Sequence, residues 1–323
     1  MPSESNVKTA ANAAALENRI HGKKYLKIFG GVALSLSLAT AVYFFYFPSS
    51  TTSQFKGREE RSVAEMYDHD DLSACSLFAG NFINFGFWEQ PVKAGTISVA
   101  QRIDSEKNLY RFVIKKLGVV EEDKLLEVAC GQGVGSALAM TEFHPKEMHG
   151  IDFSKAQISR AKKINSEVIQ KNLSKIFFQE GAAENIPYDS NSFEKVFSIE
   201  AAQHFESLEN FAKEANRVLK PGGKVAIASF FGTSDKSQDS LSTMIQTIRD
   251  GIDKATPIYK LEETLKKNGF KNIKIESIGK NVWHGFDQWT AQGDLRDGWT
   301  RNWYKGYQKG LIDYYLITAE KPD

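Results

Sequence analysis

This sequence contains little cysteine and carries almost no net charge. Only Cys75 and Cys130 occur among its 323 residues. Two cysteines do not make a disulfide framework, and no Cys/His spacing typical of a zinc site is present, so we interpret both as reduced thiols and expect no metal. The formal net charge is +1. This balance produces no overall field that would draw the protein to nucleic acid, and we expect no nucleic-acid partner.

Charged residues are absent altogether from residues 28–47, which read IFGGVALSLSLATAVYFFYF. The length matches the about 20 residues that a helix needs to cross a bilayer. An aromatic cluster closes the segment, and Pro48 follows where a helix would end. A cleaved signal peptide would have a shorter apolar core, and a buried or surface helix would have a polar face. The segment therefore predicts one transmembrane helix.

A glycine-rich loop follows an apolar run in residues 125–135, which read LLEVACGQGVG. This pattern predicts a first strand that leads into a phosphate or nucleoside loop. Its glycines let the backbone approach a ligand closely. The next apolar segment, MHGIDF (148–153), predicts a strand that ends at Asp152, which can accept hydrogen bonds from ribose hydroxyls. Ser154 predicts the cap of a following helix. Either NAD or S-adenosylmethionine is compatible with this βαβ unit.

Three later motifs separate these cofactors: EGAAENIPYDSNSFEKVFSIEAAQHF (180–205), RVLKPGGKVAIASF (217–230) and YYLITAEKP (314–322). With them, residues 65–323 resemble the class I S-adenosylmethionine-dependent methyltransferases, in particular the branch of sterol, tocopherol and natural-product O-methyltransferases. The resemblance implies S-adenosyl-L-methionine as the cofactor. It also implies a Rossmann-like α/β fold: a seven-stranded, mostly parallel sheet with helices on both faces and an antiparallel last strand. The Pro221-Gly222-Gly223 turn is expected ahead of a strand at Lys224–Phe230 and carries no chemistry.

The resemblance also implies a set of cofactor-binding residues. In it Glu127 holds the methionine amino group or orients the glycine turn, and Asp152 binds the ribose. The family usually has aspartate where this chain has Ala182, which leaves the adenine contact to Glu184 or to a backbone group. The complete predicted set is Tyr67, Glu127, Ala129, Gly131, Gln132, Gly133, Asp152, Phe153, Gln157, Ala183 and Glu200.

His204 is the candidate catalytic residue, because it lies where related O-methyltransferases carry an active-site histidine. A histidine can act as a general base near neutral pH. It could instead cap the strand end or pack under the cofactor. Related enzymes often have an aspartate after the fifth strand, where this chain has Ala228-Ser229-Phe230. Without that acid, a nitrogen, sulfur or carbon acceptor, or O-methylation by histidine alone, becomes relatively more favoured.

Two aromatic-rich segments bracket the core. By resemblance, the first (78–88) belongs to an N-terminal lid at residues 63–104, with Asn84 where the family often has histidine. The second is a cap insertion at residues 278–310 within a methyltransferase domain at 105–323. It contains Trp283, His284, Phe286, Trp289, Trp299, Trp303 and Tyr304. These aromatics predict either plain core or a large apolar cavity for a lipophilic acceptor such as a sterol, prenylated quinone or lipid.

Residues 1–27 are predicted to be a disordered tail and residues 48–62 a linker. Basic residues flank the predicted span on both sides, at 19–27 and 56–61, so the charge bias that orients it is weak. Because S-adenosylmethionine is made in the cytosol, we expect a single-pass membrane protein whose catalytic domain faces the cytosol. The alternatives are a non-catalytic scaffold that binds S-adenosylmethionine or a lipid, and a nucleotide-dependent oxidoreductase.

Overall fold

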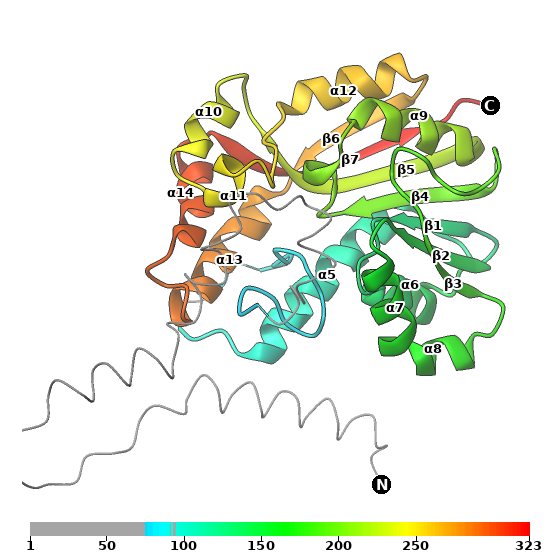
Figure 1. Cartoon of the computed structure of the whole chain (residues 1–323), viewed down its shortest axis with the longest axis horizontal. Helices are drawn as coiled ribbons and strands as arrows, with labels where there is room; N and C mark the ends of the chain where they lie inside the picture. The colour runs from blue at the N-terminus through cyan, green and yellow to red at the C-terminus, as the bar shows by residue number, and fades with distance from the viewer. Residues whose placement is uncertain (1–74, 91, 93–94) are drawn as a thin grey trace, which may run out of the picture. The chain divides into compact units, whose positions relative to one another are not determined.

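The computed structural model describes residues 75–90, 92 and 95–323 (Figure 1). The predicted transmembrane helix at 28–47, the tail and linker around it, and Tyr67 lie outside these residues. Within the described ranges, no helix combines the length and the apolar character needed to cross a membrane.

Seven strands form one sheet in the order β3-β2-β1-β4-β5-β7-β6 (Figure 1). Neighbours from β3 to β5 pair in parallel, whereas β7 is antiparallel to both β5 and β6. The predicted mostly parallel sheet with an antiparallel last strand is confirmed. The strands are β1 (Lys124–Val128), β2 (Glu147–Asp152), β3 (Ile176–Glu180), β4 (Phe193–Ile199), β5 (Leu219–Gly232), β6 (Lys271–Ser277) and β7 (Ile312–Glu320).

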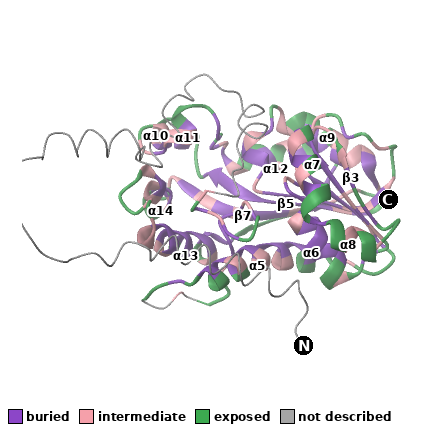
Figure 2. Cartoon of the chain, turned by 60° about the horizontal axis from the view of Figure 1, so that its bottom comes forward, coloured by how far each residue is buried: buried purple, intermediate pink, exposed green. Residues whose placement is uncertain are grey.

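Helices cover both faces of the sheet, as predicted. Leu125 packs in one core cluster with residues of α5, α6 and α7, and Leu126 packs in the other with residues of α9 and α12. Successive side chains of a strand point to opposite faces, and both leucines are fully buried. Figure 2 shows that the strands between the helices are mostly buried. The helices are α5 (Val99–Leu117), α6 (Val134–Phe143), α7 (Lys155–Ile164), α8 (Ser166–Lys171), η2 (Ala202–His204), α9 (Leu208–Val218), α10 (Ser237–Ser242), α11 (Gln246–Arg249), α12 (Ile258–Lys267), α13 (Gly279–Gln292), η3 (Trp299–Arg301) and α14 (Asn302–Gln308).

Local sequence signals explain where several of these helices begin. The Ser154 hydroxyl accepts a hydrogen bond from the Gln157 N–H and caps α7, as predicted. Ser207 caps α9 in the same way through the Asn210 N–H. Each cap satisfies one of the N–H groups that the first helical turn leaves without an internal partner.

The fifth strand is longer than predicted. It begins at Leu219, so Pro221-Gly222-Gly223 lies within β5 rather than ahead of it. The Gly222 N–H donates to the Lys321 carbonyl and the Lys321 N–H donates to the Gly223 carbonyl, each over about 3 Å. The turn is thus bound to the residue that follows β7. A local pattern does not reveal this extension, because the partner lies at the far end of the chain.

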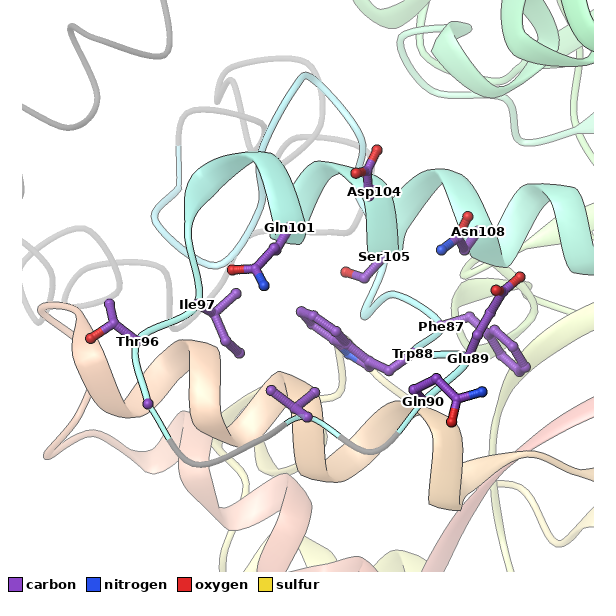
Figure 3. A pocket seen from close by; sticks show the side chains of 12 residues that line it. Phe87, Trp88, Glu89, Gln90, Thr96, Ile97, Gln101, Asp104, Ser105 and Asn108 are labelled. Atoms are coloured by element: carbon purple, nitrogen blue, oxygen red, sulfur yellow. The ribbon is translucent and has the colours of Figure 1, made fainter.

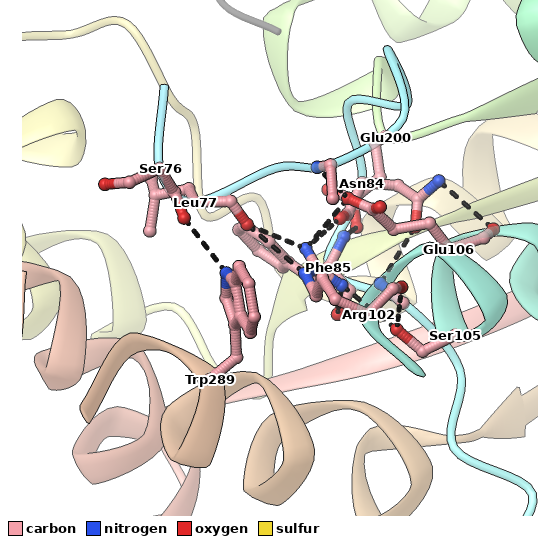
Figure 4. A network of polar contacts seen from close by, with 11 residues as sticks. Ser76, Leu77, Asn84, Phe85, Arg102, Ser105, Glu106, Glu200 and Trp289 are labelled. Carbon is pink, nitrogen blue, oxygen red and sulfur yellow. Dashed lines mark hydrogen bonds and ion pairs between the residues drawn. The ribbon is translucent and has the colours of Figure 1, made fainter. Parts of the chain in front are cut away.

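A buried arginine organises the segment that precedes α5 (Figure 4). The Arg102 guanidinium donates to the carbonyl oxygens of Leu77 (3.0 Å), Asn84 (2.7 Å) and Phe85 (3.1 Å). It also pairs with Glu106 at 3.1 Å, and both side chains are completely buried. Residues 77–88 contain only turns and extended chain. The planar fork of guanidinium donors therefore satisfies carbonyl groups that no strand partner satisfies.

Arg102→Met should lower the free energy of unfolding by about 3–5 kcal/mol, because Glu106 would stay buried without its counter-charge. Arg111→Met is the matched control. It removes the guanidinium that pairs with Glu142 at the surface, where the two side chains are 29% and 37% exposed, and should cost about 1 kcal/mol or less. Urea unfolding of both variants measures the difference. Equal losses would contradict an organising role for Arg102.

Candidate active site

The predicted cofactor residues within the described ranges come from one edge of the sheet. Residues 129–133 follow β1, Asp152 ends β2, Ala183 lies shortly after β3 and Glu200 follows β4. The carboxyl ends of parallel strands share an edge, and ligands bind there at the point where strand order reverses. In this sheet that point lies between β1 and β4.

Asp152 ties the glycine loop to the start of α7. Its Oδ2 accepts a hydrogen bond from the Gly131 N–H and its Oδ1 accepts one from the Ser154 N–H, each at 2.9 Å. An ionised carboxylate only accepts hydrogen bonds, which is what ribose hydroxyls require of a partner. Asp152 is 5% exposed. Its position fits the predicted ribose contact.

The loop after β1 holds its backbone in the left-handed region at Ala129 (φ 61°), Gly131 (φ 52°) and Gly133 (φ 66°). The two glycines differ in their surroundings. A Cβ on Gly133 would lie 2.5 Å from a ring carbon of Phe178, whereas a Cβ on Gly131 would meet no atom within 4 Å. Gly133 is therefore needed for packing. Gly131 leaves open space next to Asp152, as a ligand-contacting backbone requires.

Three other predicted cofactor residues are Gln132 in this loop and Phe153 and Gln157 after β2. Gln132 and Gln157 are buried, and Phe153 is 38% exposed. Gln157 Oε1 accepts a hydrogen bond from Arg160. Among the described residues Gln157 Nε2 has no hydrogen-bond partner, which leaves a donor on the first turn of α7. An open glycine backbone, a buried carboxylate and the Gln157 amide donor together fit an adenosyl ligand.

Glu127 orients helices on one face of the sheet. The Tyr110 hydroxyl donates to its Oε1 at 2.9 Å, and the Ser136 hydroxyl donates to its Oε2. Burial raises the pKa of Glu127 to about 7, although the two hydrogen bonds act in the opposite direction. Both oxygens are engaged by α5 and α6. Of the two roles predicted for this residue, the structure favours orienting the turn and the helix that follows it.

The structure also separates the two candidates for the adenine contact. Glu184 Oε1 accepts hydrogen bonds from the N–H groups of Glu206 (2.9 Å) and Ser207 (3.3 Å). The carboxylate thus holds the chain at the start of α9. Ala183 is buried next to it. This arrangement favours a backbone group for the adenine contact.

Glu200 connects the end of β4 to the segment held by Arg102. It has φ 54°, and its Oε1 accepts a hydrogen bond from the Phe85 N–H at 3.1 Å (Figure 4). Desolvation raises the pKa of Glu200 to about 8. Asn84 is buried and joins its own segment to α5: its Oδ1 accepts from the Gly86 N–H and its Nδ2 donates to the Glu106 carbonyl. Asn84 thus shapes the segment around Phe85.

His204 ends the short helix η2 directly after β4. Its Nδ1 lies 2.9 Å from the Ile252 carbonyl oxygen, and its Nε2 lies 3.2 Å from the Gln203 amide nitrogen. The Asp253 carboxylate lies 3.5 Å from the same Nδ1. Sequence reasoning missed Asp253, because it comes from the connection between α11 and α12, which carries no motif. Only the fold brings it to His204.

The aromatic residues of the two bracketing segments pack on one another. Phe85 has ring centroids 4.5 Å from Phe286, 5.3 Å from Trp283, 5.5 Å from Trp303 and 6.2 Å from Phe230. All five side chains are buried. They form a cluster, called here the aromatic cluster, that joins the lid segment to β5, α13 and α14. The rings themselves fill the region for which a cavity was one of the two predictions, and in this state they are core.

A separate hollow of about 390 Å³ lies between the lid segment and α5, lined in part by Trp88, Gln101 and Asp104 (Figure 3). None of the predicted cofactor or catalytic residues lines it. This hollow is therefore distinct from the predicted cofactor site.

Comparisons with known proteins identify the family of this domain. A family model described as a methyltransferase domain matches residues 126–227. An O-methyltransferase of Aspergillus nomiae is 31% identical over 172 residues, which cover 52% of this chain and 71% of the relative. A sterol 24-C-methyltransferase of Pneumocystis carinii is 33% identical over 195 residues, which cover 57% of this chain and 49% of the relative.

The fold is also similar to solved structures. One is a geranyl diphosphate C-methyltransferase from Streptomyces coelicolor A3(2) in complex with Mg²⁺, geranyl diphosphate and S-adenosyl-L-homocysteine. It matches with a TM-score of 0.67 at 16% sequence identity, over 84% of this chain and 99% of that chain. At this level of identity the likeness is one of fold.

Gly131→Ala and Gly133→Ala should separate the two functions of the loop. Both variants force alanine into the left-handed region, at roughly 1–2 kcal/mol each. Gly133→Ala also drives its Cβ into Phe178, which should cost a further 1–3 kcal/mol or so. Urea unfolding should therefore show the larger loss for Gly133→Ala. A loss of the same size in Gly131→Ala would mean that Gly131 does not border open space.

Proposed function

Because this chain belongs to the class I S-adenosylmethionine-dependent methyltransferases, we propose that it methylates a small lipophilic acceptor while anchored to a membrane. The Asp152 carboxylate is the observation that carries the cofactor assignment. Its Oδ2 accepts the Gly131 N–H of the glycine loop, and a ribose would bind next to this contact. The Rossmann-like sheet places it at the edge where such folds bind nucleosides.

Bound S-adenosylmethionine supplies a methyl group that its positive sulfur already activates. The protein's main contribution is then to align the acceptor with that methyl group, which can supply about 7–11 kcal/mol in favourable cases. Asp152 and the backbone at Gly131 would hold the adenosyl part. The segment pinned by Arg102 and Glu200 covers the same edge and would exclude water.

A lipophilic acceptor is supported by the aromatic cluster. Its rings lie at the carboxyl end of β5, and Phe85 joins them to Glu200 at the end of β4. An apolar acceptor that enters beside the cofactor would take over contacts that these rings now make with one another. The relative that acts on sterols and the structure that holds geranyl diphosphate are consistent with a large apolar substrate.

Membrane anchoring is supported by the uncharged segment at residues 28–47. The anchor would keep the enzyme at the surface in which a lipophilic acceptor dissolves. We place the catalytic domain on the cytosolic side, where S-adenosylmethionine is made. The disordered tail, the linker, the lid at 63–104 and the cap at 278–310 complete the proposed organisation. The helix α5 is continuous through residues 104 and 105, so lid and core are linked by one rigid element.

Calorimetric titration of the full chain in detergent should show micromolar binding of S-adenosylmethionine and S-adenosylhomocysteine. Asp152→Ala should abolish this binding, because the loop loses both its hydrogen-bond acceptor and the ribose contact. Asp189→Ala, which removes an exposed aspartate, is the control and should bind as the unmodified chain does. NADH should not bind. The cofactor assignment would be wrong if the folded protein bound NADH, or if it bound neither S-adenosylmethionine nor S-adenosylhomocysteine.

Incubation with vesicles of a total membrane lipid extract and methyl-labelled S-adenosylmethionine should carry the label into the organic phase. Deletion of residues 28–47 should slow this transfer, because the enzyme no longer concentrates at the vesicle, and should leave cofactor affinity unchanged. Label confined to water-soluble products would contradict a lipophilic acceptor. An unchanged rate after the deletion would contradict the anchor.

A further inference from the structure

The His204 ring is held between two segments that are distant in sequence. Residues 252–254, between α11 and α12, pack along η2. The Lys254 N–H donates to the Gln203 carbonyl at 3.1 Å, and Lys254 Nζ donates to the Phe205 carbonyl at 2.9 Å. On the same stretch of chain, the Ile252 carbonyl oxygen lies 2.9 Å from His204 Nδ1. The position of Asp253 next to His204 is therefore fixed by its neighbours on both sides.

The hydrogen bonds assign the protons of the neutral His204 ring. A carbonyl oxygen only accepts, so Nδ1 must carry the proton that it donates to Ile252. The Gln203 amide is oriented by two further partners: its Oε1 accepts from the Ser229 hydroxyl at 2.6 Å, and its Nε2 donates to the Glu200 carbonyl at 3.0 Å. Its second N–H therefore points at His204 Nε2, which must accept. The basic nitrogen of this histidine is Nε2.

Asp253 lies on the opposite, protonated side of the ring. Its Oδ1 is 3.5 Å from Nδ1, and the residue is 7% exposed. Burial raises the pKa of Asp253, and the neighbouring His204 opposes that rise. Its own backbone N–H is satisfied by the Thr247 carbonyl. The carboxylate is thus positioned to stabilise positive charge on the ring once Nε2 takes up a proton.

The other titratable groups around the pair do not replace this carboxylate. Glu200 precedes η2; its Oε1 accepts a hydrogen bond from the Phe85 N–H, and its charge repels that of Asp253. Lys254 is directed to the Phe205 carbonyl. Ser229 of β5 donates its hydroxyl to Gln203 Oε1 and carries no charge. Ser229 is thus at the position where related enzymes often carry an aspartate, and it holds the Gln203 amide in place. The acid next to His204 is Asp253, which comes from another part of the chain.

We propose that Asp253 positions the His204 ring and stabilises its protonated form, so that His204 acts as the general base for a hydroxyl acceptor. This enzyme is therefore an O-methyltransferase. The inference rests on the methyl transfer proposed above. The acceptor hydroxyl takes the place of the Gln203 amide at His204 Nε2 and gives its proton to that nitrogen. The oxygen forms the new bond to the methyl carbon as the sulfur–carbon bond breaks. The products are a methyl ether or ester, neutral S-adenosylhomocysteine and an imidazolium whose Nδ1–H faces Asp253.

The titration of His204 tests the pair without any acceptor. In the full chain in detergent, labelled with ring-¹⁵N histidine, His204→Asn identifies the signals of this residue. Asp253→Asn keeps the shape of the side chain but removes its charge, so the His204 titration midpoint should fall by about 1 pH unit or more. Asp253→Glu should restore most of the midpoint. Asp250→Asn, in the same connection and paired with Arg249, should leave it unchanged.

An unmoved midpoint in Asp253→Asn would overturn the positioning role. Binding of S-adenosylmethionine is measured on the same samples, and it should be equal in all the Asp253 and Asp250 variants. Loss of binding in the unmodified chain would instead refute the methyltransferase proposal itself. Normal binding with an unmoved midpoint would refute only the role of Asp253.

The acceptor atom is tested with S-adenosylmethionine that carries a ¹³C-methyl group and with the lipid-extract vesicles. The carbon chemical shift of the transferred methyl distinguishes attachment to oxygen from attachment to nitrogen, sulfur or carbon. We expect an O-methyl signal, formed about 10²-fold more slowly by Asp253→Asn near neutral pH, a loss typical of impaired general-base catalysis. A signal from a carbon-, nitrogen- or sulfur-bound methyl would overturn the assignment.

Discussion

The buried guanidinium of Arg102 is the interaction on which the covered side of the site depends. Residues 77–88 belong to no helix or strand, so their carbonyl groups lack regular backbone partners, and burying such groups without a partner is unfavourable. Arg102 satisfies three of these carbonyls from α5, and Glu106 compensates its charge. The segment can therefore lie over the sheet edge with Phe85 directed at β5 and Glu200. Without that anchor, neither the aromatic cluster nor the Glu200 contact would have a fixed partner.

Buried carboxylates give the same edge its electrostatic character. Glu127 and Glu200 both have pKa values raised by desolvation, to about 7 and about 8. Asp152 lies between them in chain order and is also buried. A positively charged ligand at this edge would favour the ionised forms of all three groups. The sulfonium and ammonium charges of S-adenosylmethionine are of that kind, so the acids that shape the loop also suit the cofactor that the family uses.

Short-range patterns predicted the framework well. The glycine loop, Asp152 and the Ser154 cap belong to one βαβ unit, and each of them depends on neighbours within a few residues. β4 (Phe193–Ile199) lies within the motif at residues 180–205. The fifth strand was predicted too short, because its first residues bond to Lys321 beyond β7. The sequence did not specify how the aromatic segments pack, since a stripe of rings has the same sequence whether it surrounds a cavity or fills one.

Motifs along the sequence, through their resemblance to the methyltransferase family, predicted the sheet, an edge for the cofactor and a candidate histidine. The groups that surround this histidine became evident from the fold alone. Ser229 stands where an acid was expected, and its hydroxyl instead orients Gln203. The acid, Asp253, arrives from a connection without periodicity or motif, held by backbone bonds to η2. Contacts between segments so distant in sequence depend on how the chain packs, and no local pattern encodes them.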